Sequence, residues 1–150
     1  MLETTGGVVT KTVRLECPLA RAFSLFTEEI SEWWPPERRH TGDPNSRIVL
    51  SEAGRFFERD SAGKELELGA VLSWEPPRRL LLDWYPGTDR EHPTRVEVLF
   101  TPDGAATRLL IVHSATASSE ALFPLRAPRY EASWELVVQA LARASTLDNT

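Results

Sequence analysis

Two titratable side chains of this sequence are candidates for acid–base chemistry. His113 falls on the apolar face of an expected strand, and Glu58 shares a strand face with Phe56 by the same alternation. An imidazole exchanges its proton near neutral pH, and a buried carboxylate needs a partner or a raised pKa. A Glu58–His113 pair across a cavity would orient a ligand or transfer a proton. In the plainer interpretation, His113 is a satisfied core histidine and Glu58 pairs with a surface arginine such as Arg55 or Arg59.

The five tryptophans are the second chemical feature of the sequence. They fall at the ends of expected elements, and each ring combines a large apolar surface with one N–H donor. Clustered rings of this kind either line a hydrophobic pocket or fill a core, and the sequence leaves both interpretations open. No residue is assigned as catalytic. The candidate ligand-binding residues are Trp34, Phe56, Glu58, Trp74, Trp84, His113, Trp134 and Val138.

Several common chemistries lack their sequence motifs. The histidines at positions 40, 92 and 113 do not have the close spacing of a zinc site. Neither a glycine-rich phosphate loop nor a Gly-x-Ser-x-Gly nucleophile motif occurs. Cys17 is the only cysteine, and its place between a strand and Pro18 indicates a small buried residue. We therefore expect no metal ion and no cofactor.

The composition predicts one globular domain spanning residues 1–150, with an ordered core over about residues 8–146 and short flexible termini. The chain is 41% hydrophobic and 26% charged, and its net charge of −5 argues against a nucleic-acid partner. No apolar run reaches the roughly 20 residues that a membrane span requires. The first residues lack the basic and apolar regions of a signal peptide. Together with the single cysteine, these features predict a cytoplasmic protein without a membrane partner.

The first third of the chain predicts one strand and two short helices. Residues 8–16 alternate between apolar and polar side chains, as a half-buried strand does. A helix follows from Pro18, a residue that suits a first helical turn. A second short helix is expected from Thr27 to Trp33, and residues 35–46 form a polar loop.

The rest of the chain predicts six strands and a long helix. In residues 65–75 the apolar side chains share one parity from Leu66 through Leu72 to Trp74. An acidic, proline-containing loop is expected over 86–93. Apolar residues follow helical spacing between Pro128 and Ala144. The expected strands cover residues 48–50, 55–59, 65–75, 79–85, 94–101 and 106–114.

This order of elements predicts an α+β fold. Consecutive strands joined by short turns favour antiparallel pairing, with the helices kept to one face. We expect a curved antiparallel sheet of about six to seven strands wrapped around the long C-terminal helix. Because a single long helix covers a wide sheet, a cavity walled by tryptophan rings is expected between them.

Short motifs in a fixed order along the chain resemble one superfamily. They are Pro18-x-x-Arg21-Ala22-Phe23, Trp33-Trp34-Pro35, Gly54-Arg55-Phe56-Phe57-Glu58, Gly69-x-Val71, Trp74-Glu75-Pro76-Pro77-x-Arg79-Leu80, Trp84, the strand from Thr107 to His113, and Trp134. Over roughly residues 8–145, they resemble the SRPBCC superfamily, which shares its helix-grip fold with START lipid-transfer domains and the birch-pollen allergen. Within it, the chain is similar to the branch that includes the C-terminal domain of the activator of heat-shock-protein-90 ATPase. The resemblance implies a helix-grip fold with a central cavity.

Three departures from the family pattern concern the expected pocket. The chain has Ala53-Gly54 where the family usually carries paired glycines, and Ser133-Trp134 where it carries a Gly-Trp pair. Residues 114–128 replace a glycine-bearing turn. We expect these differences at the pocket mouth, where they would change the ligand rather than the fold.

Three functions follow as hypotheses. The first is an intracellular binding protein that holds a small hydrophobic or aromatic ligand between the sheet and the C-terminal helix. The alternative is a cyclase- or aromatase-type enzyme that uses Glu58 and His113 in the same cavity. The third is stimulation of a chaperone ATPase, which we do not expect because the sequence has no additional chaperone-binding module. A weak homodimer through the outer sheet residues Leu81, Tyr85 and Leu99 stays open.

Overall fold

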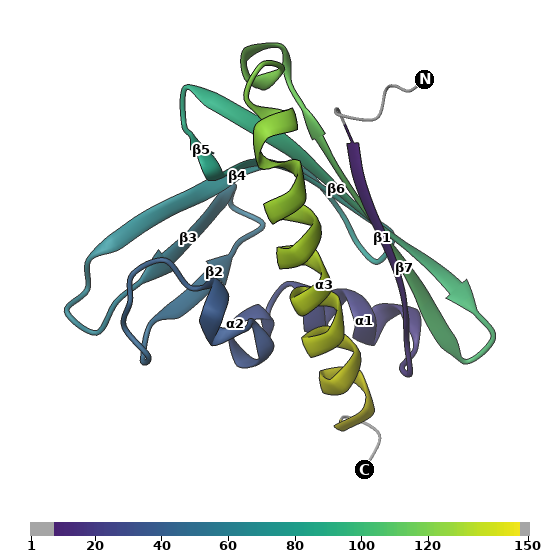
Figure 1. Ribbon diagram of the computed structural model, residues 1–150. Coiled ribbons are helices and arrows are strands. Elements are labelled where there is room, and N and C mark those ends of the chain that lie inside the picture. The colour runs from purple at the N-terminus through teal and green to yellow at the C-terminus, as the bar shows by residue number, and fades with distance from the viewer. Residues whose placement is uncertain (1–7, 148–150) are drawn as a thin grey trace, which may run out of the picture.

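A seven-stranded antiparallel sheet and one long helix form the body of the protein. The computed structural model describes residues 8–147, so the expectation of flexible termini lies outside the described residues. The strands follow the order β1-β7-β6-β5-β4-β3-β2, and α3 (Phe123–Leu147) runs along one face of the curved sheet (Figure 1). The strands are β1 Val8–Leu15, β2 Arg47–Leu50, β3 Arg55–Arg59, β4 Glu65–Glu75, β5 Arg79–Asp89, β6 His92–Asp103 and β7 Ala106–Ala115. The predicted helix-grip fold is confirmed.

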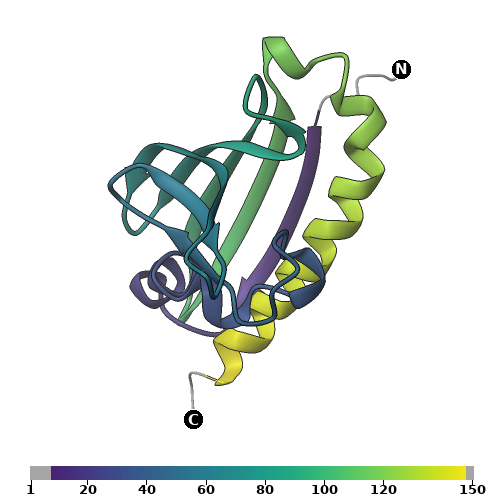
Figure 2. The same cartoon turned by 90° about the vertical axis from the view of Figure 1, so that its left-hand side faces the viewer.

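The alternation of apolar and polar residues decides which face of the sheet receives α3. In β6, Val96 and Val98 are buried on the inner face, while Arg95 and Glu97 alternate with them on the outer face. The outer residues pair with charges on β5, as Arg95 does with Asp83 at 3.0 Å. A side view shows α3 lying along the opposite face (Figure 2). The sheet is therefore apolar toward the helix and charged toward solvent.

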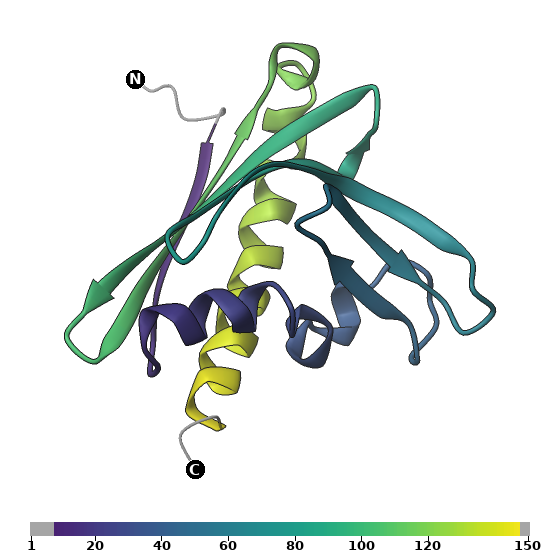
Figure 3. The ribbon, with the colours of Figure 1, turned by 180° about the vertical axis from the view of Figure 1, so that it is seen from behind.

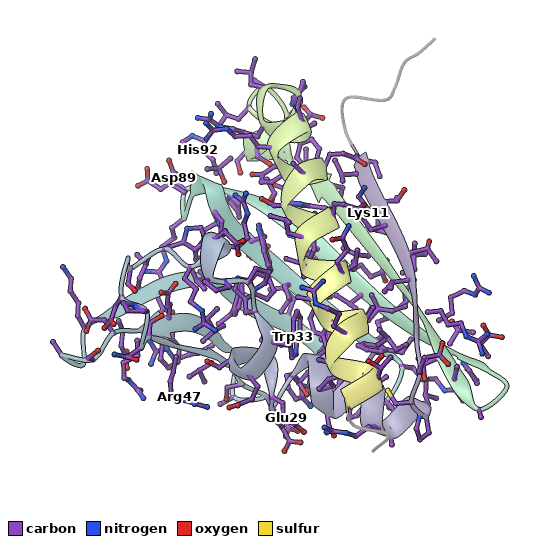
Figure 4. The ribbon with its side chains drawn as sticks, turned by 60° about the horizontal axis from the view of Figure 1, so that its bottom comes forward. Lys11, Glu29, Trp33, Arg47, Asp89 and His92 are labelled. Carbon is purple, nitrogen blue, oxygen red and sulfur yellow. The ribbon has the colours of Figure 1, made fainter. Side chains whose placement is uncertain are left out.

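One polar residue of the inner face ties β1 to α3. Lys11 forms ion pairs with Glu131 at 2.7 Å and with Glu135 at 3.0 Å. The labelled Lys11 side chain lies on the strand beside the helix (Figure 4). This pair of contacts closes the side of the fold where β1 forms the sheet edge.

None of the helices in residues 8–147 is long and apolar enough to cross a membrane.

Two short helices follow β1 and support the lower part of α3 (Figure 3). Helix α1 (Leu19–Phe26) follows Pro18 and buries Phe23 and Phe26. Helix α2 (Ile30–Trp33) is shorter than the predicted segment because Thr27–Glu29 forms a turn. A short 3-10 turn, η2 (Pro36–Arg38), starts the long loop that leads to β2.

The predicted single parity of β4 is wrong. The register with β5 shifts between Val71 and Ser73, and this irregularity reverses the alternation. Leu72 is consequently 47% exposed, whereas Val71 and Trp74 pack against the core. The bulge therefore separates Trp74 from the inward-facing residues earlier in the strand.

The predicted loop over residues 86–93 is also wrong, because β5 and β6 continue through it. Asp89 and His92 face each other in a tight hairpin, and the Asp89 carboxylate accepts hydrogen bonds from the backbone N–H groups of Glu91 and His92. The labels of Figure 4 place Asp89 and His92 together at this tip. Side-chain capping thus replaces the loop expected from the prolines.

The C-terminal helix begins at Phe123, five residues before the predicted start at Pro128. A proline inside a helix removes one backbone hydrogen bond. Phe123 and Tyr130, which flank Pro128, both pack on His113 with ring centroids 5.3 and 4.1 Å away. A second 3-10 turn, η3 (Ala117–Ser119), precedes the helix. Packing on both sides therefore holds the helix through the proline.

Aromatic rings fill the centre between the sheet and α3. Trp84 lies 5.1 Å from the ring of Phe56 and 5.1 Å from that of Trp134. Trp34 joins them at 6.2 Å from Trp84 and 6.4 Å from Trp134. Such tilted and edge-on pairs pack without large voids. Open volume therefore lies beside this cluster and not at its centre.

We predict that Gly69→Ala destabilises the fold. A methyl group at Gly69 would lie 2.1 Å from the carbonyl oxygen of Asp83 on the neighbouring strand, and 3.1 Å from the Phe56 ring. Separating the strands should cost about 1–3 kcal/mol of unfolding free energy. Gly104→Ala is the control, because nothing lies within 4 Å of its added methyl and only its φ of 62° opposes the change. Urea denaturation measures both, and an equal or smaller loss for Gly69→Ala would contradict the packing.

Candidate functional site

A pocket of about 240 Å³ opens beside the aromatic cluster. Its apolar wall consists of the rings of Trp34, Trp84, Trp134 and Tyr130, together with Val137. The wall is built from three elements: the C-terminal end of α2, strand β5, and one face of α3. The first three rings belong to the tryptophans that the sequence marked as candidates.

The charged rim of the pocket comes from the loop after α2 and from α3. Arg38, Arg39, His40 and Glu37 follow one another on the loop, and Arg129 lies on the helix. Arg39 is used internally, because its guanidinium donates to the carbonyl oxygens of residues 31, 34 and 46 at 2.7, 3.3 and 2.9 Å. Arg39 therefore holds the loop together, whereas Glu37, Arg38 and Arg129 supply the other charges of the rim.

Pro86 and Gly87 close the pocket beside Tyr130. The Tyr130 hydroxyl donates a hydrogen bond to the Pro86 carbonyl at 2.9 Å. Gly87 has a φ of 88°, and a methyl group there would lie 2.5 Å from the Tyr130 hydroxyl oxygen. Only glycine allows this close approach. Burial raises the pKa of the Tyr130 hydroxyl, which therefore stays protonated.

His113 lies next to the pocket in a closed hydrogen-bond chain. The indole N–H of Trp134 donates to Nδ1 of His113 at 3.0 Å. Nε2 lies 2.7 Å from the hydroxyl of Thr94, which itself donates to the carbonyl of Trp84 at 2.9 Å. Because Nδ1 accepts and the Thr94 proton is used, the imidazole is the neutral tautomer with its proton on Nε2. Burial lowers the pKa of His113 to about 3.

Glu58 lies apart from His113 and holds the loop instead. Its carboxylate accepts hydrogen bonds from the backbone N–H of His40 at 2.8 Å and of Thr41 at 3.1 Å, and from the Thr41 hydroxyl at 2.7 Å. Burial opposes the charge, but the Thr41 and His40 donors outweigh it, so the pKa of Glu58 is lowered. The predicted Glu58–His113 pair is wrong, and so is the pairing of Glu58 with a surface arginine.

The structure brings only part of the predicted site residues to the pocket. Trp34, Trp84 and Trp134 line it. His113 is the satisfied core histidine of the plainer interpretation, and Phe56 and Val138 are packed in the core. Trp74 does not line the pocket and lies edge-on to Phe23, with the ring centroids 5.5 Å apart. Of the family departures, Ser133 lines the pocket, while Ala53 and residues 114–128 do not.

Sequence patterns did not single out the residues that give the pocket its polarity. Arg129, Tyr130 and Ser133 share one face of α3 with Trp134 and Val137, a spacing of three to four residues that the sequence contains. The expected helix from Pro128 to Ala144 contains all three, but its apolar pattern indicates only positions from Trp134 onward as candidates. Arg38 had no sequence signal, since a short run of charges in a polar loop is typical of a solvated surface.

These features define the class of the protein. A curved antiparallel sheet closed by one long helix, with a pocket between helix and sheet, is a helix-grip fold. The chain belongs to the family described as Activator of Hsp90 ATPase homolog 1-like protein, whose family model matches residues 16–145. No curated protein matches the chain in sequence.

Solved structures of several bacterial and eukaryotic proteins share this fold. The self-sacrificing resistance protein CalC from Micromonospora echinospora superposes with a TM-score of 0.74 at 24% identity, covering 95% of this chain and 96% of that chain. Protein NE0264 from Nitrosomonas europaea superposes with a TM-score of 0.70 at 15% identity, covering 98% of this chain and 99% of that chain. PFC0360w, an HSP90 activator from Plasmodium falciparum, reaches 0.53 at 14% identity, covering 73% of each chain. At these identities, the likeness concerns the fold alone.

We predict that His113→Phe destabilises the protein and reduces the loss of its unfolding free energy between neutral and acidic pH. The unfolded chain binds a proton on His113 below about pH 6.5, whereas the native pKa is about 3. The contribution of His113 is therefore complete above about pH 6.5 and declines as the pH falls toward the native value. At pH 7.5 the variant should lose about 2–3 kcal/mol, because Trp134 keeps a buried N–H without an acceptor.

Urea denaturation at pH 7.5 and at pH 5 measures this effect. The wild-type protein should lose more stability than His113→Phe between the two pH values. Parallel pH profiles for the two proteins would contradict a buried, neutral imidazole.

We predict that Glu58→Gln loosens the loop over residues 35–46. The wild-type carboxylate should contribute about 1–3 kcal/mol at pH 7 through its charge-assisted hydrogen bonds. Because its native pKa is lowered, this contribution is complete above the unfolded pKa of about 4.3 and is lost as the pH falls through the native value. Amide hydrogen exchange at His40 and Thr41 should accelerate in the variant. Glu52→Gln is the control, because Glu52 is exposed. Unchanged amide exchange in Glu58→Gln would contradict a role of the Glu58 carboxylate in holding this loop.

Proposed function

We propose that the protein binds a compact aromatic molecule in the pocket between β5, the loop over residues 35–46 and α3. The observation that carries this proposal is the wall of three indoles and a phenol ring around an open volume. Rings of this kind stack on flat ligands and exclude water from them. Each wall residue is itself held by the core, so the pocket is formed before a ligand arrives.

Trp84 also supplies an unused hydrogen-bond donor. The indole N–H groups of the other pocket tryptophans are occupied, Trp34 by the Arg38 carbonyl at 3.3 Å and Trp134 by His113 at 3.0 Å. Among residues 8–147, the Trp84 N–H takes part in no hydrogen bond, and it is not one of the fully buried unpartnered donors. A ligand with one acceptor atom would satisfy it.

The volume limits the size of the ligand. Pockets for drug-sized ligands usually span about 300–1,000 Å³, whereas this one measures about 240 Å³. A molecule of one or two fused rings fits this space, whereas a lipid with a full acyl chain does not. The proposal therefore narrows the expected hydrophobic ligand to a small, flat one.

The geometry favours binding over turnover by the expected acid–base pair. Both nitrogens of His113 and both oxygens of Glu58 already have protein partners, and neither residue lines the pocket. A cyclase- or aromatase-type reaction would need other groups. Fold likeness does not decide the matter, since related structures are described as a resistance protein and as an HSP90 activator. The absence of a chaperone partner stays a prediction.

We predict that Ser133→Trp blocks ligand binding. Ser133 lines the pocket, so a large ring there should occupy the space of the ligand. A neutral probe, 2-naphthamide, should raise the melting temperature of the wild-type protein by mass action, and the variant should lose at least about tenfold in affinity. Isothermal titration calorimetry measures the affinity.

The control is Ala132→Trp, because Ala132 is the exposed neighbour on the same helix and does not line the pocket. It should bind 2-naphthamide as the wild-type protein does. If a panel of neutral and anionic one- and two-ring compounds leaves the wild-type melting temperature unchanged, the proposed function is wrong.

A further inference from the structure

The pocket rim is positively charged although the chain is acidic. The chain carries a net charge of −5, yet the rim holds Arg38, Arg39 and Arg129 against one carboxylate, that of Glu37. Such a concentration of one sign at a concave site attracts a ligand of the opposite sign. The apolar wall alone would not require it.

The charge of Arg39 is already balanced within the protein. Its guanidinium is bound by backbone carbonyl oxygens, and although burial lowers its pKa, the charge of the nearby Glu58 carboxylate opposes that shift. Arg38 and Arg129 remain, and the Glu37 carboxylate offsets the charge of one of them. The rim therefore retains a single positive charge, which one monoanion would balance.

Arg38 and Arg129 differ from the arginines of the sheet. On the sheet, Arg79 bonds Glu97 at 2.6 Å and Arg95 bonds Asp83 at 3.0 Å. Within residues 8–147, the guanidinium groups of Arg38 and Arg129 form no ion pair or hydrogen bond, and Nε of Arg38 is buried without a partner. A buried, unpaired N–H of a charged group is costly unless a ligand satisfies it.

We propose that Arg38 and Arg129 bind the carboxylate of an aromatic acid whose ring lies against the indole wall. This inference rests on the proposed function and names its ligand class. A guanidinium presents planar donors that match a carboxylate, and hydrogen bonds between ionised groups are stronger than neutral ones. The ligand is therefore a flat one- or two-ring carboxylic acid in its ionised form.

The loop holds Arg38 ready for this contact. The Arg38 backbone N–H donates to the Pro35 carbonyl at 3.0 Å, and its carbonyl accepts from the Trp34 indole at 3.3 Å. Glu58 secures the residues that follow, His40 and Thr41. Binding then orders little more than the side chain, which preserves affinity.

Two probes of equal size separate charge from shape. Isothermal titration calorimetry at low salt compares 2-naphthoate, which is an anion, with its neutral amide, 2-naphthamide. The wild-type protein should bind 2-naphthoate about tenfold more tightly or better. Arg38→Gln and Arg129→Gln should each lower the affinity for 2-naphthoate about tenfold, while the affinity for 2-naphthamide stays within about twofold.

Arg143→Gln is the matched control, because this substitution changes the net charge by the same amount. Arg143 is exposed on α3, as Arg129 is, and does not line the pocket. It should leave both affinities unchanged. Retained binding of 2-naphthamide shows that the pocket of each variant is intact. Equal wild-type affinity for the two probes, or an equal loss of both in the arginine variants, would overturn the acid site and leave the aromatic pocket. Binding of neither probe would overturn the proposed function and this inference with it.

Discussion

The buried hydrogen-bond chain through His113 fixes the position of α3 on the sheet. It runs from the Trp134 indole on α3 to His113 on β7, then to Thr94 on β6, and ends at the Trp84 carbonyl on β5. Apolar contacts are non-directional, so packing alone would tolerate small shifts of the helix along the sheet. Each polar group in this chain would cost about 1–3 kcal/mol if it lost its partner in the interior. The helix is therefore held in one register, and the rings beside it are held with it.

The same chain explains why the chemistry of the pocket is at its rim. An imidazole with both nitrogens occupied and a pKa of about 3 neither accepts a proton nor donates one at neutral pH. Its role is to join a helix to three strands, so that Trp84 and Trp134 form a firm wall. The polar groups of the pocket lie outside this core, on the loop after α2 and on α3, and in the proposed function they would contact the ligand. An apolar wall fixed by the core, with polar groups at the rim, is the arrangement expected of a binding site.

Sequence patterns predicted the parts of this structure that depend on periodicity. The alternation around His113 placed it correctly on the inner face, and the same rule turned Glu58 inward. The partners of these residues were not predictable in this way. Thr94 and Trp134 lie 19 and 21 positions from His113, and Glu58 binds backbone N–H groups of a loop that carries no repeating pattern. The exposure of Leu72 in β4 follows from shifts in the pairing with both neighbouring strands, which the segment itself does not reveal. Arg38 and Arg39 are adjacent and of one type, and only their contacts distinguish them.

The loop over residues 35–46 has little regular secondary structure beyond η2, and two opposite charges bind its two kinds of backbone group. The Glu58 carboxylate accepts from the backbone N–H groups of His40 and Thr41, and the Arg39 guanidinium donates to carbonyl oxygens on either side. Burial lowers the pKa of the half-buried Arg39 guanidinium, and the charge of the nearby Glu58 carboxylate opposes that shift. Arg38 lies between the segments that these two charged groups hold, and its own side chain takes part in neither set of contacts. A loop held in this way presents a charged group beside the aromatic wall. Under the proposed function, this arrangement favours a rigid ligand over a flexible one, because neither partner then loses much conformational freedom.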